Sequence, residues 1–183
     1  KMILADMEID GEQRKVIMQA PKNGFFYVID RTSGWFISAN NCVPTNWASH
    51  VDSETGRPVE IKETNHELQP ALTTPGPLGG HNWHPMSYSL QTGLVYIPAQ
   101  ETIFIYSTDN EFEYNPNTWN LANQIEMSYL PKDPNELAMV DAATVGYLLA
   151  WNPIEQKEVW RAQYKRPWSG GVLSTDGNLV FQG

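Results

Sequence analysis

The sequence predicts an all-β fold, in which four-stranded antiparallel units are arranged as part of a β-propeller. Three observations support this prediction. Short apolar or alternating runs recur along the chain between turn residues, which is typical of strands. One strand–turn–strand pattern occurs three times. Helix signals are weak, because the best candidate, Glu136–Met139, is crowded by Pro131 and Pro134.

The predicted strands are short, and polar or glycine-containing turns separate them. Tight turns contain Gly11, Gly34, Gly93 and Gly177, and glycine supplies the positive φ that such hairpins require. In chain order, the predicted strands are Met2–Ile9, Arg14–Ala20, Gly24–Asp30, Phe36–Ala39, Met86–Ser89, Leu94–Pro98, Ile103–Ser107, Thr144–Asn152, Glu158–Gln163, Gly171–Ser174 and Asn178–Phe181.

The repeated pattern consists of a strand, a polar residue, a short turn and a second strand. Its polar positions are Asp30, Ser89 and Asn152, which follow one another at intervals of 59 and 63 residues. Repeats of this kind, interrupted by excursions, are typical of propeller blades, whereas a β-sandwich gives no reason for a repeat. We therefore expect about three four-stranded blades.

Two segments interrupt the repeat and are predicted to be long loops. Residues 40–77 contain Pro44, Pro58, Pro70 and Pro75 and few apolar pairs, and residues 109–134 are similarly irregular. Loops of this length inside a domain are usually functional or form interfaces. Both ends of the chain stop within strand patterns, so we expect residues 1–183 to be a fragment of a single domain.

Charge and cysteine content exclude several classes of protein. The 183 residues include 12 Lys+Arg and 21 Asp+Glu, for a net charge of −9, and no basic run is present for contacting nucleic-acid phosphates. The single cysteine, Cys42, excludes an internal disulfide framework and a CxxC site. The longest apolar run, around Val145–Trp151, is far shorter than the roughly 18 residues that span a membrane. Residues 1–6 do not form a signal peptide.

Several segments resemble one known family. Ala150–Trp160 resembles the A-x-D-x-x-T-G-x-x-x-W blade motif of the pyrroloquinoline quinone (PQQ) dehydrogenases, with Asn152 in place of Asp and Glu155-Gln156 in place of Thr-Gly. Gln19–Arg31 resembles, almost residue for residue, a segment of the periplasmic PQQ alcohol dehydrogenases, especially the quinohaemoprotein type. Further similar segments are Asn46–Ala48, Thr55–Pro58, His81–Met86, Thr92–Pro98 and Gly177–Gly183. The resemblance implies an internal fragment of an eight-bladed quinoprotein propeller.

The resemblance also implies that three residues contact the cofactor. Lys22 would reach the ortho-quinone oxygens of PQQ and polarise the C5 carbonyl that receives hydride. Asn82 would donate hydrogen bonds to the polar edge of PQQ, and Trp83 would contact it as well. Gly79-Gly80 would let the backbone approach a ligand closely. Without the resemblance, Lys22 would be interpreted as a solvated charge in a turn.

Other parts of the family's active site have no counterpart in residues 1–183. The resemblance places the catalytic Asp, the Ca²⁺ ligands and a vicinal Cys-Cys ring upstream of Lys1, and the chain contains no C-x-x-C-H haem motif. We therefore expect no catalytic residue and no metal ligand in this fragment. PQQ and Ca²⁺ would be cofactors of the full-length parent. We expect the fragment alone to bind neither and to be inactive.

The remaining candidates have structural interpretations beside functional ones. His81 and His84 flank Trp83 and are either metal ligands or loop hydrogen-bonding groups; without a third ligand, the second interpretation is favoured. Cys42 is predicted to be a small buried hydrophobic residue. Packing roles are predicted for Trp47, Trp119 and Trp168.

The leading interpretation is a portion of a periplasmic PQQ-dependent dehydrogenase that oxidises primary alcohols to aldehydes and passes electrons to a c-type cytochrome. One alternative is a non-catalytic propeller fragment that self-associates or binds partners through unpaired strand edges. A second alternative is a PQQ dehydrogenase that acts on sugars, although the sequence around Asn82 and Trp83 favours the alcohol enzymes. We expect no nucleic-acid partner and no membrane span.

Overall fold

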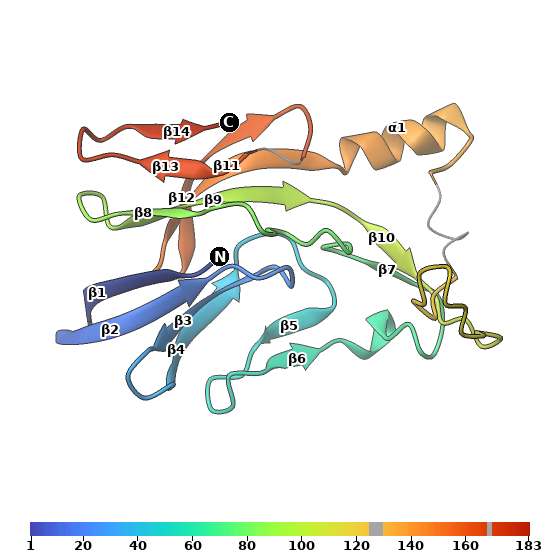
Figure 1. The fold of residues 1–183 in the computed structure, drawn as a ribbon, viewed down its shortest axis with the longest axis horizontal. Helices are drawn as coiled ribbons and strands as arrows, with labels where there is room; N and C mark the ends of the chain where they lie inside the picture. The colour runs from blue at the N-terminus through green and yellow to red at the C-terminus, as the bar shows by residue number, and fades with distance from the viewer. Residues whose placement is uncertain (125–129, 168–169) are drawn as a thin grey trace.

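A computed structural model describes residues 1–124, 130–167 and 170–183. Two four-stranded antiparallel sheets form its body, each with neighbouring strands in chain order (Figure 1). The first sheet contains β1 (Ile3–Ile9), β2 (Glu12–Gln19), β3 (Phe25–Asp30) and β4 (Phe36–Asn41). The second contains β8 (Ser87–Ser89), β9 (Leu94–Glu101), β11 (Val145–Asn152) and β12 (Lys157–Tyr164).

Three two-stranded sheets complete the strands of the described residues. They are formed by β5 (Ala48–Val51) with β6 (Pro58–Glu60), β7 (Ala71–Thr73) with β10 (Phe104–Tyr106), and β13 (Val172–Ser174) with β14 (Val180–Gln182). The prediction of a mostly β structure built from antiparallel four-stranded sheets is therefore confirmed.

The sheets are stacked face to face, and apolar side chains fill the space between them. The largest cluster joins the two four-stranded sheets, and Phe26 of β3 contacts Trp151 of β11 with ring centroids 6.0 Å apart. A second cluster packs the opposite face of β9 and β11 against β13–β14, and a third packs the outer face of β3 against β5. Figure 1 accordingly shows β8, β9, β11 and β12 between the first sheet and β13–β14.

One side-chain link ties the two four-stranded sheets together. Gln156, in the turn between β11 and β12, donates from Nε2 to Ser38 Oγ of β4 at 3.0 Å. Asn40 Nδ2 donates back to the Gln156 carbonyl, also at 3.0 Å. Gln156 has a φ of 52°, in the left-handed region, at the position where the blade motif has glycine. The residue in this unusual backbone conformation is therefore also the one that links the two sheets.

The hairpin turns follow the glycine pattern with one exception. Gly11, Gly34 and Gly93 have positive φ, as predicted. In the β13–β14 turn the positive φ of 57° belongs to Asn178 and not to Gly177, so that prediction was wrong. Asparagine enters the left-handed region more easily than most residues because its short polar side chain can form local hydrogen bonds.

The helix α1 (Pro134–Ala142) replaces the single weak turn that the sequence suggested. Pro134 occupies the first turn, where the missing N–H has no intrahelical partner in any case. The Asp133 carboxylate accepts hydrogen bonds from the backbone N–H groups of Asn135 and Glu136 and so caps the helix. A proline counted as a helix breaker is therefore part of the helix start. Within the described ranges, no helix has the length and apolar character needed to cross a membrane.

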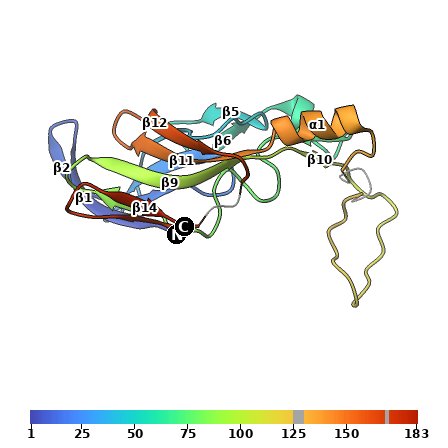
Figure 2. The ribbon, with the colours of Figure 1, turned by 90° about the horizontal axis from the view of Figure 1, so that it is seen from above.

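The two segments predicted to be long loops differ from each other. Residues 40–77 contain β5, β6, β7 and the 3₁₀ helix η1 (Lys62–Thr64), so this segment is not one uninterrupted loop. Its strands were missed because each has only three or four residues and the segment combines several prolines with few apolar pairs, so no alternating pattern stands out. In residues 109–134, the described part before α1 has only the bridge from Asn123 to Thr108. Residues 125–129 lie outside the described residues. Figure 2 shows residues 109–124 projecting from the stacked sheets.

Candidate functional site

The connection between β7 and β8 lies against the turn that contains Lys22. The Gly80 N–H donates to the Lys22 carbonyl at 3.1 Å. Lys22 Nζ in turn donates to the Pro77 carbonyl at 3.0 Å and is otherwise exposed. Lys22 is thus held through both its backbone and its side chain by residues 55 or more positions away in the sequence.

Asn82 and Trp83 belong to the same connection. Asn82 Nδ2 donates to the Leu78 carbonyl at 2.9 Å, next to the Pro77 carbonyl that accepts from Lys22. Trp83 is 65% exposed and stacks on the His84 ring, with centroids 4.5 Å apart and planes inclined by 24°. The Lys22 ammonium and the Asn82 amide therefore donate to adjacent carbonyls. In the same connection, Trp83 exposes its indole ring to solvent.

The glycines of this connection lie in close contact with two other parts of the chain. Gly79 has a φ of 79°, and a Cβ at this position would lie 2.5 Å from the Cα of Lys22. A Cβ at Gly80 would lie 2.3 Å from Val43 Cγ2. The two glycines therefore allow close approach to Lys22 and Val43, and the expectation that they also let the backbone approach a ligand closely stays a prediction.

His81 anchors the connection from inside the protein. Its side chain is buried, and Nδ1 lies 2.8 Å from the Pro98 carbonyl of β9. Burial lowers the pKa of the imidazole to about 4, because the charged form loses its hydration. The ring is therefore neutral at pH 7, and its Nδ1–H donates to the carbonyl. This contact agrees with the loop hydrogen-bonding interpretation. No group of three His, Cys, Asp or Glu residues suited to a metal occurs in the part of the chain that the structure describes.

Two further candidates have the structural roles predicted for them. Trp47 Nε1 donates to the Asn23 carbonyl at 2.9 Å, and its ring meets Phe25 edge-on at a centroid distance of 6.1 Å. Cys42 is buried, donates from Sγ to the Gly24 carbonyl, and has a thiol pKa raised to about 12 by burial. Both residues brace the segment that follows Lys22. Trp119 is 82% exposed, which contradicts a packing role, and Trp168 lies outside the described residues.

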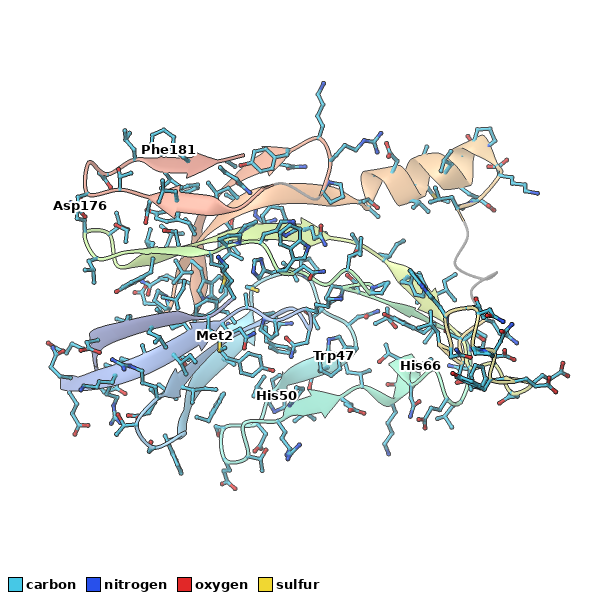
Figure 3. The ribbon with its side chains drawn as sticks, in the orientation of Figure 1. Met2, Trp47, His50, His66, Asp176 and Phe181 are labelled. Carbon is cyan, nitrogen blue, oxygen red and sulfur yellow. The ribbon has the colours of Figure 1, made fainter. Side chains whose placement is uncertain are left out.

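A separate cleft of about 470 Å³ lies beside η1. Its lining includes Trp47 and His66, which Figure 3 labels, together with Tyr106 of β10. The His66 ring packs on the Tyr106 ring at a centroid distance of 5.4 Å. The residues that line this cleft include Trp47 but not Lys22, Asn82 or Trp83. The cleft is therefore distinct from the candidate cofactor residues.

We predict that Gly79→Ala destabilises the fold more than Gly34→Ala does. The two glycines have almost the same φ, 79° and 78°, so alanine meets the same backbone penalty, about 1 kcal/mol, at both. Only the Gly79 Cβ collides with the backbone of Lys22, because nothing lies within 4 Å of a Gly34 Cβ. Urea unfolding of both variants should show an additional loss of about 2 kcal/mol or more for Gly79→Ala. Equal losses would mean that the Lys22 contact is not tight.

Stability should fall as the pH falls from about 6.5 to about 4, partly through His81. An unfolded histidine has a pKa of about 6.5, whereas folded His81 has a pKa of about 4. In this window the unfolded state binds the extra proton, so acid favours unfolding by up to about 3 kcal/mol. A plot of the free energy of unfolding against pH should be flatter across this range for His81→Asn than for the wild type. A His81→Asn variant with the wild-type slope would contradict this assignment.

Comparisons with known proteins give one consistent result. No protein-family model matches the chain. The whole chain is 46% identical to the quinohemoprotein alcohol dehydrogenase of Comamonas testosteroni, covering 25% of it, and 46% identical to the 1-butanol dehydrogenase (cytochrome c) of Thauera butanivorans, covering 26%. The chain therefore spans about a quarter of the length of these curated relatives.

Solved structures agree with the sequence comparison. The quinohemoprotein alcohol dehydrogenase ADHIIG of Pseudomonas putida matches the whole chain with a TM-score of 0.93 and 41% identity, over 27% of that enzyme. A europium-containing methanol dehydrogenase matches with a TM-score of 0.81 and 27% identity, over 31% of its chain. Over its whole length, the chain is therefore similar in sequence and in fold to one segment, about a quarter, of the quinohemoprotein alcohol dehydrogenases.

Proposed function

We propose that the chain is the part of a PQQ-dependent dehydrogenase that supplies Lys22, Asn82 and Trp83 to the cofactor site. The enzyme as a whole would oxidise primary alcohols to aldehydes in the periplasm and deliver electrons to a c-type cytochrome. The observation that carries the proposal is the convergence of Lys22 and Asn82 on the adjacent carbonyls of Pro77 and Leu78.

The chemistry of these side chains fits PQQ, a planar ortho-quinone with three carboxylates. The exposed Lys22 ammonium uses one of its three donors on Pro77, which leaves donors for quinone or carboxylate oxygens. Trp83 offers an exposed aromatic surface to a planar group. When bound, PQQ supplies the two-electron acceptor for alcohol oxidation.

The residues of this chain would orient and polarise the cofactor. Lys22 would donate a charge-assisted hydrogen bond to a quinone oxygen and stabilise the negative charge that develops there. Asn82 would donate to a neighbouring oxygen and fix the rotation of the ring in its plane. We propose that the general base and the Ca²⁺ ligands come from outside residues 1–183, in keeping with the family resemblance.

The stacked sheets also support a proposal for the fold. The first sheet and the sheet containing β9 and β11 would be two complete propeller blades. The β13–β14 pair packs on the second sheet in the same face-to-face manner. We propose that it forms the first half of a third blade of an eight-bladed propeller.

Lys22→Met in the dehydrogenase that carries this segment should abolish most PQQ-dependent activity. Removing a charge-assisted donor at a developing oxyanion costs about 100- to 1,000-fold in kcat. The measurement is primary-alcohol oxidation by enzyme reconstituted with PQQ and Ca²⁺. Lys15→Met is the matched control, because Lys15 is an exposed lysine on β2 and should retain wild-type turnover.

Three outcomes would count against this proposal. Alcohol turnover by the wild-type enzyme without PQQ would remove the cofactor assignment. Normal activity of Lys22→Met would remove the role of this lysine. A preference for glucose over ethanol would favour the alternative in which the parent is a sugar dehydrogenase.

A second candidate function, self-association of the 183-residue chain, is favoured by its open apolar faces. Leu4 of β1 is 62% exposed, and Met2, the residue before β1, is 60% exposed. A groove of about 320 Å³ lined by Met2, Ile17 and Tyr27 lies on this outer face. Across the stack, Leu173 and Phe181 are exposed on β13 and β14, and Figure 3 shows Phe181 at the outer side of the layers. Such faces favour association when nothing else covers them.

If this second function holds, the isolated chain should form oligomers that dissociate on dilution. Leu173→Asp should shift the population towards monomer, because it places a charge in an apolar contact. Leu68→Asp is the control, since Leu68 is exposed on the segment after η1, away from both faces. Light scattering over a range of concentrations distinguishes the cases. A monodisperse monomer at high concentration would exclude self-association.

A further inference from the structure

We infer that Gln100, at the end of β9, is a positioning residue for Lys22 and Asn82. This inference rests on the proposed function, because it concerns residues assigned there to the cofactor. Gln100 does not belong to the segments that resemble the PQQ dehydrogenases, and the sequence did not single it out. In the structure, however, Gln100 is linked to both candidate side chains through residues 77–83 of the connection between β7 and β8.

Gln100 holds that connection with three hydrogen bonds. Its backbone N–H donates to the Gly80 carbonyl at 2.9 Å. Its side-chain Nε2 donates to the Gly79 carbonyl at 3.0 Å and lies 3.4 Å from the Leu78 carbonyl. The side chain is 4% exposed, so these contacts are shielded from water and costly to leave unmade.

Two short chains of contacts lead from Gln100 to the candidate cofactor residues. In the first, Gln100 Nε2 donates to the Gly79 carbonyl, and the N–H of the same peptide group, that of Gly80, donates to the Lys22 carbonyl. In the second, Gln100 Nε2 shares the Leu78 carbonyl with Asn82 Nδ2. The buried side-chain amide of Gln100 therefore holds the Gly79–Gly80 peptide group, whose N–H binds Lys22, and lies at the Leu78 carbonyl that binds Asn82.

A glutamine suits this position better than its closest replacements. It provides two N–H donors at the end of a side chain long enough to cross from β9 to the connection. Methionine has nearly the same length and shape but no donor. Glutamate would place acceptor oxygens against the Gly79 and Leu78 carbonyls, which themselves can only accept.

The experiment compares Gln100→Met and Gln100→Glu with the wild type in the dehydrogenase that carries this segment. We expect the dissociation constant for PQQ to rise about tenfold in Gln100→Met and further in Gln100→Glu, with lower kcat and an unchanged KM for the alcohol. A tenfold change corresponds to the loss of about one hydrogen bond. In the isolated 183-residue chain, the Gly80 amide should exchange with solvent faster in Gln100→Met, while amides of β2, which is paired with β1 and β3, keep their protection.

Two controls separate positioning from general destabilisation. Val95→Ala removes buried apolar volume from the same strand and should lower the thermal midpoint without changing PQQ affinity. Gln163→Met alters an exposed glutamine on β12 and should change neither. A wild-type PQQ dissociation constant in Gln100→Met, or an equal loss of affinity in Val95→Ala, would overturn the inference.

The same measurements distinguish failure of the inference from failure of the proposed function. If the wild-type dehydrogenase neither binds PQQ nor requires it, the proposed function is wrong. The role of Gln100 in holding the connection is then decided by amide exchange alone. Unchanged exchange at Gly80 in Gln100→Met would reject that role, whatever the cofactor.

Discussion

The apolar layer between the two four-stranded sheets is the contact on which the candidate site depends. Val16 and Phe26 on one side and Ile97 and Leu149 on the other are completely buried in it. This packing fixes the position of the turn between β2 and β3 relative to the end of β9. Lys22 lies in that turn, and Gln100 lies near the end of β9. The hydrogen bonds between Lys22, Gly80 and Gln100 can form because the layer holds these two points within reach of the same connection.

Much of the fold could be predicted from the sequence, because a long strand is recognised from the alternation of apolar and polar residues within a few neighbouring positions. Strands of six or more residues with an apolar face, such as β1, β2 and β11, were predicted within about two residues of their observed ends. The strands β5, β6 and β7 were missed because they are short and lie in a proline-containing segment with few apolar pairs, and β7 pairs with β10, about 30 residues further along the chain. The start of α1 was missed because Pro134 was interpreted as a helix breaker. Proline breaks a helix in its interior but is well tolerated in its first turn, where Pro134 lies.

The candidate site was predictable only through resemblance to a family. A lone lysine in a turn, an asparagine and an exposed tryptophan give no chemical signal in the sequence itself. Their relation depends on contacts between residues as far apart as Lys22 and Pro77. Gly79 was noticed as a glycine, but the reason for it, the nearby Cα of Lys22, requires the tertiary structure. Gln100 resembles any other polar residue near the end of a strand until its partners on the connection are known.

The link through Gln156 has a mechanical consequence when it is considered together with Gln100. The Gln156 turn joins β11 and β12 at the end of the second sheet where β9 begins, whereas Gln100 is near the end where β9 finishes. Each end is attached to the first sheet, one through Ser38 and Asn40, the other through Gly80 and Lys22. Attachment at both ends opposes sliding and in-plane rotation of one sheet relative to the other, and the apolar layer opposes their separation. The register between the two sheets is therefore set at both ends of β9 and not at one end alone.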